Sequence, residues 1–386
     1  MGFRHHGAAH VAHRRAAAGT GPVTVPEQLN PAQQQLRNEA QAFAASVDAE
    51  ASAANVRSAS QAAGFFTMTQ PAEFGGAQAS VLELTIVRDE LSAAGMPHAN
   101  AVFGPGPGVL AGVKEPLRSA YLHPLMAGGK RAAFAFTEPD DAPHPTRAAR
   151  EGDWLIVNGA KSYVTGGADA HFMNTLVHIE DEGPALVVID TDAKGVSMDR
   201  RFASLDGSHH AAFSFTDARV PAANIIGQPG EGMPRAMRQI GDTRLAIAAN
   251  CAGTMRWVAT FLETHLVGKD RAGKRRGDKE GVRLRYADLR IAAFAARSMV
   301  YRTARLADSG ANVVNEGIAC KVFATEHLQN SVDTAIGLVG GNALVESHTL
   351  AVLYRTVSSL RLAEGANDVL RLNLVRGALE LNKGVL

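Results

Sequence analysis

The chain has 386 residues, enough for two or three domains with a sizeable buried core. Its 39 basic and 38 acidic residues nearly cancel, which gives no reason to expect nucleic acid or a charged membrane surface as the main partner. The 2 cysteines are too few for a disulfide framework or a cysteine-based metal site, so a reducing, cytoplasmic location is expected. No apolar run reaches the roughly 18 residues of a membrane span, and small molecules are the expected ligands.

Residues 1–26 are rich in alanine and arginine and contain no acidic residue. Transit peptides share this bias. A metal could in principle bind the histidines of this segment, His5, His6, His10 and His13. We prefer to interpret the segment as a disordered extension or an over-long start, and we expect no metal site.

Residues 27–130 predict an α-helical domain. Asn30 supplies a helix cap and Pro31 a first-turn proline, and apolar residues then recur at helical spacing. Further helices are expected near residues 82–94 and 115–126. Glycine-rich loops separate them, at Gly75-Gly76 and at residues 104–108.

Residues 131–235 predict a β domain of sandwich or barrel type. Short apolar runs alternate there with turn-forming residues, and they predict strands at 132–137, 154–157, 172–178, 185–189 and 211–215.

Residues 236–386 return to helical periodicity and predict a four-helix bundle, with helices near 245–266, 284–307, 315–339 and 344–359. The fold class is therefore α+β, without the βαβ alternation of a dinucleotide-binding domain. A basic segment at 269–283 interrupts the bundle pattern. It is either a solvated surface loop or a contact for phosphate or a partner.

Near the C-terminus, Glu364 is followed at once by Gly365 and then by small polar residues that are typical of a helix start. A carboxylate at such a turn can approach a ligand closely and is a candidate base. Taken alone, an acidic residue before glycine near a helix start is usually a capping group, so the motif by itself is a weak sign of catalysis.

Several segments together resemble the acyl-CoA dehydrogenase family. They are Thr137-Glu138-Pro139, residues 154–165, Arg219-Val220-Pro221, Asn224-Ile225-Ile226-Gly227, Gly340-Gly341 and residues 355–365. They occur in family order and at family-like spacing from about residue 30 to the C-terminus.

The resemblance implies an FAD-dependent enzyme that desaturates an acyl-CoA, or acyl-carrier-bound, thioester between its α and β carbons. It implies that Glu364 removes the α proton while a hydride passes to the flavin, and that electrons go on to an electron-transfer flavoprotein. Some relatives carry the base at the position of Thr243, which cannot serve here. A homo- or hetero-oligomer is expected, as a homotetramer or dimer.

The resemblance also implies contact residues. For the cofactor they are Phe136, Thr137, Tyr163, Thr165, Gly340, Gly341, Ala366 and Asp368. For the substrate they are Asp242, Thr243, Arg244 and Gly365.

Several cofactor positions depart from the family pattern. The departures are Ala142-Pro143-His144 in place of Gly-Ser-Asp, Thr264 and Val267 in place of Arg and Phe, Gly337 in place of glutamine, and Ala366 in place of threonine. These losses leave alternatives open: a subunit of a heteromeric dehydrogenase, a flavin monooxygenase of the same fold, or a non-catalytic scaffold. The basic segment could instead restore charge at the cofactor phosphates.

Overall fold

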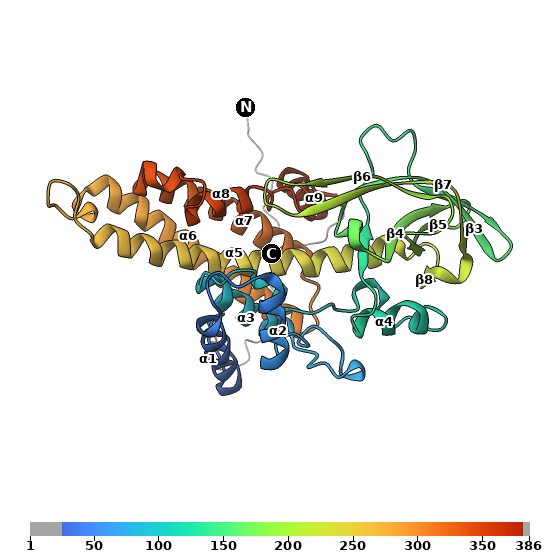
Figure 1. Ribbon diagram of the computed structural model, residues 1–386, viewed down its shortest axis with the longest axis horizontal. Coiled ribbons are helices and arrows are strands. Elements are labelled where there is room, and N and C mark those ends of the chain that lie inside the picture. The colour runs from blue at the N-terminus through green and yellow to red at the C-terminus, as the bar shows by residue number, and fades with distance from the viewer. Residues whose placement is uncertain (1–24, 381–386) are drawn as a thin grey trace, which may run out of the picture.

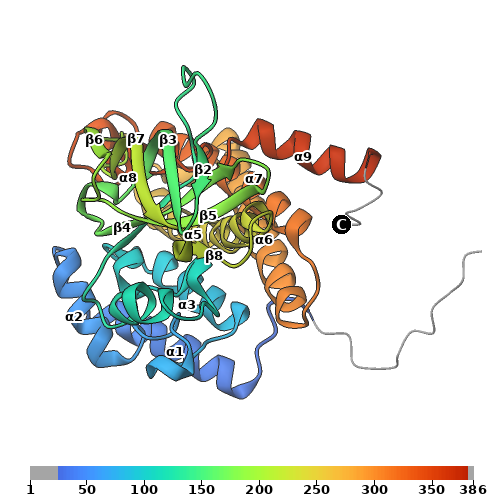
Figure 2. The same cartoon turned by 90° about the vertical axis from the view of Figure 1, so that its right-hand side faces the viewer.

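The computed structural model describes residues 25–380, and three parts follow one another along it (Figure 1). The histidines at positions 5–13 lie outside these residues. The α+β architecture expected from the sequence is confirmed, with helices first, a sheet in the middle and helices at the end. The long helix α5 (Gly232–Val267) runs along the molecule, with the sheet at one end and the helical bundle around the other (Figures 1 and 2).

The N-terminal part contains helices α1 (Pro31–Ser46), α2 (Ala53–Ala63), α3 (Val81–Ala93) and the short α4 (His123–Met126). The predicted cap of α1 is confirmed, because the Asn30 side chain accepts a hydrogen bond from the Gln33 N–H. The helix expected at 115–126 is reduced to a π-helical turn, Arg118–Leu122, followed by α4. Pro124 has no N–H to donate to the preceding turn, which explains why regular helix does not form there.

The central part is one sheet of eight strands: β1 (Ala132–Ala135), β2 (Arg147–Glu151), β3 (Trp154–Thr165), β4 (Phe172–Ile179), β5 (Gly183–Asp190), β6 (Val196–Ala203), β7 (His209–Pro221) and β8 (Ile225–Ile226). The strand order is β6-β7-β3-β2-β4-β5-β8, and β1 pairs in parallel with β4. The long β3–β7 ladder is antiparallel and has irregularities between Val157 and Gly159 and between Lys161 and Val164. The second irregularity redirects the chain at Tyr163.

The C-terminal part contains α5, α6 (Glu280–Asp308), α7 (Val314–Val339), α8 (Thr349–Ser358) and α9 (Asn367–Leu379). Helix α5 is longer than predicted, at 36 residues, and α8 is shorter, at 10 residues. By length and composition alone α5 could span a membrane, which the sequence analysis did not expect. Here half of its apolar window is buried, and the helix packs against α3, α6 and α7 as a core helix does.

Helix α3 is joined to the bundle by a close crossing and by buried ions. A Cβ at Gly253 of α5 would lie 2.2 Å from the Asp89 carbonyl oxygen of α3, so only glycine allows this approach. The buried Asp89 carboxylate accepts hydrogen bonds from Arg297 Nε at 2.8 Å and from the Tyr301 hydroxyl at 2.9 Å, and it lies 2.9 Å from Arg256 Nη1. Opposite charges thus compensate an otherwise costly buried carboxylate.

Candidate functional site

Glu364 lies in a tight turn between α8 and α9. Its backbone is left-handed, with φ 54°, and that of Gly365 has φ 101°. A non-glycine residue in this region costs about 1–3 kcal/mol, so the surrounding structure must hold the turn in place. The turn is the best candidate for a reactive carboxyl because two buried cations hold it.

The first cation is Lys321, which is fully buried on α7. Its Nζ donates hydrogen bonds to the Arg361 carbonyl at 3.1 Å, the Gly365 carbonyl at 2.9 Å and the Asn367 Oδ1 at 2.8 Å. One ammonium group therefore holds the chain on both sides of Glu364. Burial lowers the pKa of Lys321 to about 8.

The second cation is Arg244 on α5, which is also buried. Its Nε donates to the backbone carbonyl of Glu364 at 2.9 Å. This bond fixes the turn from the opposite side and leaves the carboxylate oxygens free. A Cβ at Gly365 would lie 3.4 Å from Arg244 Nη2, so the glycine keeps room for the guanidinium.

The Glu364 carboxyl has an environment that suits a base. Burial raises its pKa, and the charges of Arg244 and Lys321 oppose that rise in part. Within residues 25–380, no group donates a hydrogen bond to the carboxylate. A partly desolvated carboxylate without hydrogen bonds is more basic than a solvated one.

The segment Phe136-Thr137 lies against strand β3. The buried Lys161 donates to the Phe136 carbonyl at 3.2 Å and to Glu138 Oε1 at 2.8 Å, while the Ser162 N–H donates to the Thr137 carbonyl at 2.9 Å. Burial alone would raise the pKa of Glu138, but the hydrogen bonds from Lys161 and the Thr146 N–H outweigh it and lower the pKa. This anchoring brings Thr137 next to Ser162, the residue before Tyr163.

Tyr163 presents an aromatic face on the sheet. It has φ 51° and is 60% exposed. Its ring contacts that of Phe202 edge-on at 5.2 Å between centroids, and the Phe202 and His210 rings stack at 5.4 Å. Thr165, two residues beyond Tyr163, is exposed on the same strand, and its hydroxyl lies 3.1 Å from His210 Nδ1.

The turn between β6 and β7 connects this aromatic face to the Glu364 turn. Asp206 Oδ2 accepts a hydrogen bond from the Ser359 hydroxyl at 2.5 Å, and the Ala363 N–H donates to the Ser359 carbonyl at 3.1 Å. Figure 1 shows the end of α8 and the start of α9 beside this hairpin. These bonds tie the β6–β7 turn to the end of α8, in the segment that leads into the Glu364 turn.

Only some of the residues expected to contact the substrate lie at the Glu364 turn. Arg244 faces the Glu364 turn, whereas Asp242 lies at the surface of α5, where partial burial of its carboxyl raises the pKa. The Thr243 hydroxyl donates to the Gln239 carbonyl at 3.0 Å within the helix. Gly365 contributes its backbone to the turn, which also contains the Lys321 contact.

Other expected cofactor contacts lie elsewhere in the chain. Gly340 and Gly341 follow the far end of α7, and a helical rise of 1.5 Å per residue puts them roughly 28 Å along the axis from Lys321. Asp368 is exposed and pairs with Arg371 at 3.3 Å. Ala366 caps α9 without a side-chain hydrogen bond. A single chain does not bring the paired glycines to the Glu364 region.

The basic segment lies at the end of the bundle opposite the sheet (Figure 1), so it cannot reach the Tyr163 surface of its own chain.

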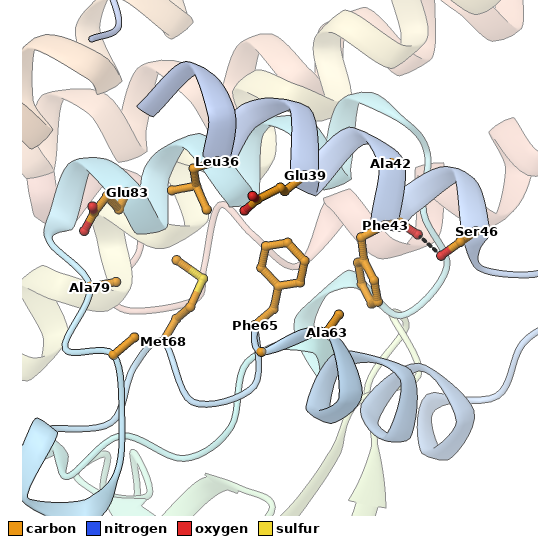
Figure 3. Close-up of a pocket in the computed structure, with 12 residues that line it drawn as sticks. Leu36, Glu39, Ala42, Phe43, Ser46, Ala63, Phe65, Met68, Ala79 and Glu83 are labelled. Carbon is orange, nitrogen blue, oxygen red and sulfur yellow. Dashed lines mark hydrogen bonds between the residues drawn. The ribbon is translucent and has the colours of Figure 1, made fainter. Parts of the chain in front are cut away.

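A hollow of about 660 Å³ lies between α1 and the loops after α2 (Figure 3). Phe43, Phe65 and Met68 line it, and it is separate from Glu364. Among residues 25–380, no cluster of His, Cys, Asp or Glu side chains could hold a metal ion.

Two functional candidates were missed by the sequence analysis, Lys321 and His210. A single lysine within an apolar helical pattern was the available signal for Lys321, because a buried ammonium must find acceptors. His210 has no local signal of this kind, because its partner Thr165 lies 45 residues away.

Comparisons with known proteins indicate one family for most of the chain. The family model "Acyl-CoA dehydrogenase, N-terminal domain" matches residues 29–129, and "Acyl-CoA dehydrogenase, C-terminal domain" matches residues 230–379. Acryloyl-CoA reductase (NADH) of Anaerotignum propionicum is 26% identical over 326 residues, covering 80% of this chain and 82% of that protein. Caffeyl-CoA reductase-Etf complex subunit CarC of Acetobacterium woodii is 26% identical over 322 residues, covering 79% of this chain and 84% of that subunit. The crystal structure of a probable acyl-CoA dehydrogenase from Mycobacterium abscessus superposes with a TM-score of 0.80 at 25% identity, covering 90% of this chain and 98% of that one.

Proposed function

Because the chain belongs to the acyl-CoA dehydrogenase family, we propose that it is an FAD-dependent oxidoreductase that acts on the α and β carbons of an acyl thioester. The observation that carries this proposal is the Glu364 turn. Its carboxyl is partly desolvated and receives no hydrogen bond within residues 25–380, and the segment that leads into the turn is bonded to the β6–β7 turn through Ser359 and Asp206. We propose Glu364 as the base that removes the α proton.

The chemistry follows from the charges around this carboxyl. A solvated glutamate is too weak a base for a thioester α carbon, and burial raises the basicity of Glu364. Arg244 and Lys321 hold the backbone of the turn, and their charges favour the ionised carboxylate and so oppose part of the rise in the pKa of Glu364. The proton removed from the α carbon ends on a Glu364 oxygen, and bound FAD would supply the acceptor for the β hydride.

The residues of the sheet suit a flat aromatic ring. Tyr163 is a large exposed aromatic side chain, held in an unusual backbone conformation by the β3–β7 irregularity. Thr165 is exposed next to it, and Thr137 is brought alongside by the Lys161 and Ser162 bonds. An isoalloxazine ring placed on Tyr163 would have hydroxyl and backbone partners at its edge.

The names of the relatives suggest both directions of this reaction, since reductases add the two hydrogens that dehydrogenases remove. Microscopic reversibility gives Glu364 the same position in either direction, as base or as acid. We propose an electron-transfer flavoprotein as the electron partner, which the name of the Acetobacterium woodii relative supports.

We propose that the working form is an oligomer. The paired glycines Gly340 and Gly341 lie far along α7 from Glu364, so they could contact a cofactor only if it belongs to another chain. Helix α9 also exposes a row of apolar side chains at helical spacing: Val369, Leu372, Val375 and Leu379. Such a row favours burial against a partner, either a second copy or a sibling subunit.

The test is the visible spectrum of the purified chain, followed by anaerobic mixing with a panel of acyl-CoA and acyl-carrier thioesters. We expect a flavin spectrum, or one that added FAD restores, and bleaching by one thioester class. A colourless protein that FAD cannot reconstitute, alone or with a sibling subunit, would reject the proposal. About half the expected flavin per chain would indicate a heteromeric enzyme.

A further inference from the structure

A row of hydrogen-bonded side chains runs from strand β3 to the end of α8. Thr165 and His210 are cross-strand partners, and the Thr165 Oγ1 lies 3.1 Å from His210 Nδ1. His210 Nε2 lies 2.9 Å from the Ser208 Oγ, which donates to Asp206 Oδ1 at 2.6 Å. The Ser359 hydroxyl completes the row by donating to Asp206 Oδ2 at 2.5 Å.

Counting protons gives each bond in this row a direction. Burial would raise the pKa of Asp206, but the hydrogen bonds from Ser208 and Ser359 outweigh it and hold the pKa below its usual value. An ionised carboxylate can only accept hydrogen bonds, so the Ser208 hydroxyl must donate its one proton to Asp206. The Ser208 oxygen must then accept a proton from His210 Nε2. A neutral imidazole carries one N–H, so Nδ1 accepts from Thr165.

We propose that His210 is a positioning residue that decides whether the Thr165 hydroxyl accepts or donates a hydrogen bond toward a ligand on the Tyr163 surface. When His210 is neutral, the Thr165 hydroxyl donates its proton to His210 Nδ1. Its oxygen can then only accept a hydrogen bond from a ligand. With protonated His210, Nδ1–H donates to Thr165, and the Thr165 proton becomes available to a ligand. Imidazole is the side chain whose charge changes most readily near neutral pH.

Groups from several elements face His210. Asp206 lies across Ser208 from the imidazole. The rings of Tyr163 and Phe202 pack on His210, and Arg200 lies 4.5 Å over the Phe202 ring.

One consequence rests on the proposed function. A nitrogen of oxidised isoalloxazine accepts hydrogen bonds, whereas the same nitrogen donates after it has received a hydride. Protonated His210 would make Thr165 the donor that the oxidised ring needs, and neutral His210 would make it the acceptor that the reduced ring needs. Reduction would then be linked to release of one proton from His210 to solvent.

The direct test uses the full chain without flavin. Histidine ¹⁵N NMR reports which imidazole nitrogen carries the proton, and the His210 signals are identified by their loss in His210→Asn. We expect neutral His210 to be protonated at Nε2. Thr165→Val should keep this tautomer because Ser208 still accepts from Nε2, whereas Ser208→Ala should shift the population toward Nδ1–H. A wild-type Nδ1–H tautomer, or a population unchanged in Ser208→Ala, would overturn the proposal.

A second measurement tests the flavin consequence. The midpoint potential of the FAD-loaded protein is measured against pH in the wild type, in His210→Asn and in Thr165→Val. We expect the wild type alone to take up one proton fewer per two electrons near neutral pH, so that its potential depends less steeply on pH than those of the two variants. Identical pH dependence in wild type and His210→Asn would refute the coupling. Failure to bind FAD would reject the proposed function but leave the tautomer result intact.

Discussion

Substituting Lys321 by methionine tests how the Glu364 turn is held. Methionine has a similar length but no donor, so the Gly365 carbonyl and the side-chain oxygen of Asn367 lose the hydrogen bond from Lys321. The Arg361 carbonyl loses it as well but still accepts from the Asn367 N–H at 3.0 Å. Buried acceptors left without a donor cost about 1–3 kcal/mol each. Removing a buried ammonium returns part of that loss, because its desolvation penalty disappears as well.

We therefore expect Lys321→Met to lower the free energy of unfolding by about 3 kcal/mol. The substitution also removes a positive charge that lowers the pKa of Glu364. The pKa of Glu364 should rise further, and the acidic limb of the pH–rate profile should move to higher pH, because the proposed base must be ionised.

Urea unfolding and a pH–rate profile measure these two effects. The matched control is Lys194→Met at an exposed lysine, which should change stability by no more than about 0.5 kcal/mol and leave the profile in place. If Lys321→Met behaves like this control in both measurements, Lys321 does not hold the turn and the reasoning is wrong.

Three further predictions concern the fold and the site. Gly365→Ala should lower the free energy of unfolding by about 1–3 kcal/mol, because a φ of 101° is strained for any residue with a side chain. By contrast, Gly281→Ala places its methyl group in open space on a helix and should stabilise the protein by up to about 1 kcal/mol. Urea unfolding measures both. Asp89→Asn should cost about 3–5 kcal/mol because it breaks a buried ion network, and thermal unfolding equal to that of the exposed Asp192→Asn variant would count against this. Because burial raises the pKa of Glu364, the rate should fall toward acid from a midpoint above the ordinary value of 4.5, and a midpoint at or below 4.5 in a pH–rate profile would contradict that assignment.

The fold was predictable where the signal is local. The Asn30 cap and Pro31 predict the start of α1 correctly, and five of the strands lie where apolar runs predict them. Strands β2 and β6 were missed because most of their side chains are exposed, so no apolar run marks them. Helix α5 begins earlier than its strongest apolar pattern, since its first turns follow the Pro229-Gly230 break directly.

The site was predictable only in part for the same reason. Glu364 and Gly365 are adjacent in sequence, so their motif is readable, but the partners of Lys321 lie 40–46 residues from it along the chain. Only the packing of α7 against the α8–α9 turn brings them together. For Gly340 and Gly341 the sequence motif is clear, but within one chain the two glycines lie far from Glu364.

Single-turnover reduction of the flavin by acyl-CoA in wild type and in Glu364→Gln tests the central claim most directly. The amide keeps the size of the side chain and the backbone bonds to Arg244 and Lys321, and it removes the basic oxygen. We predict unchanged FAD content and thioester binding, with bleaching slowed by several orders of magnitude. Bleaching at the wild-type rate in Glu364→Gln, with Glu50→Gln as the exposed control, would show that another group removes the proton.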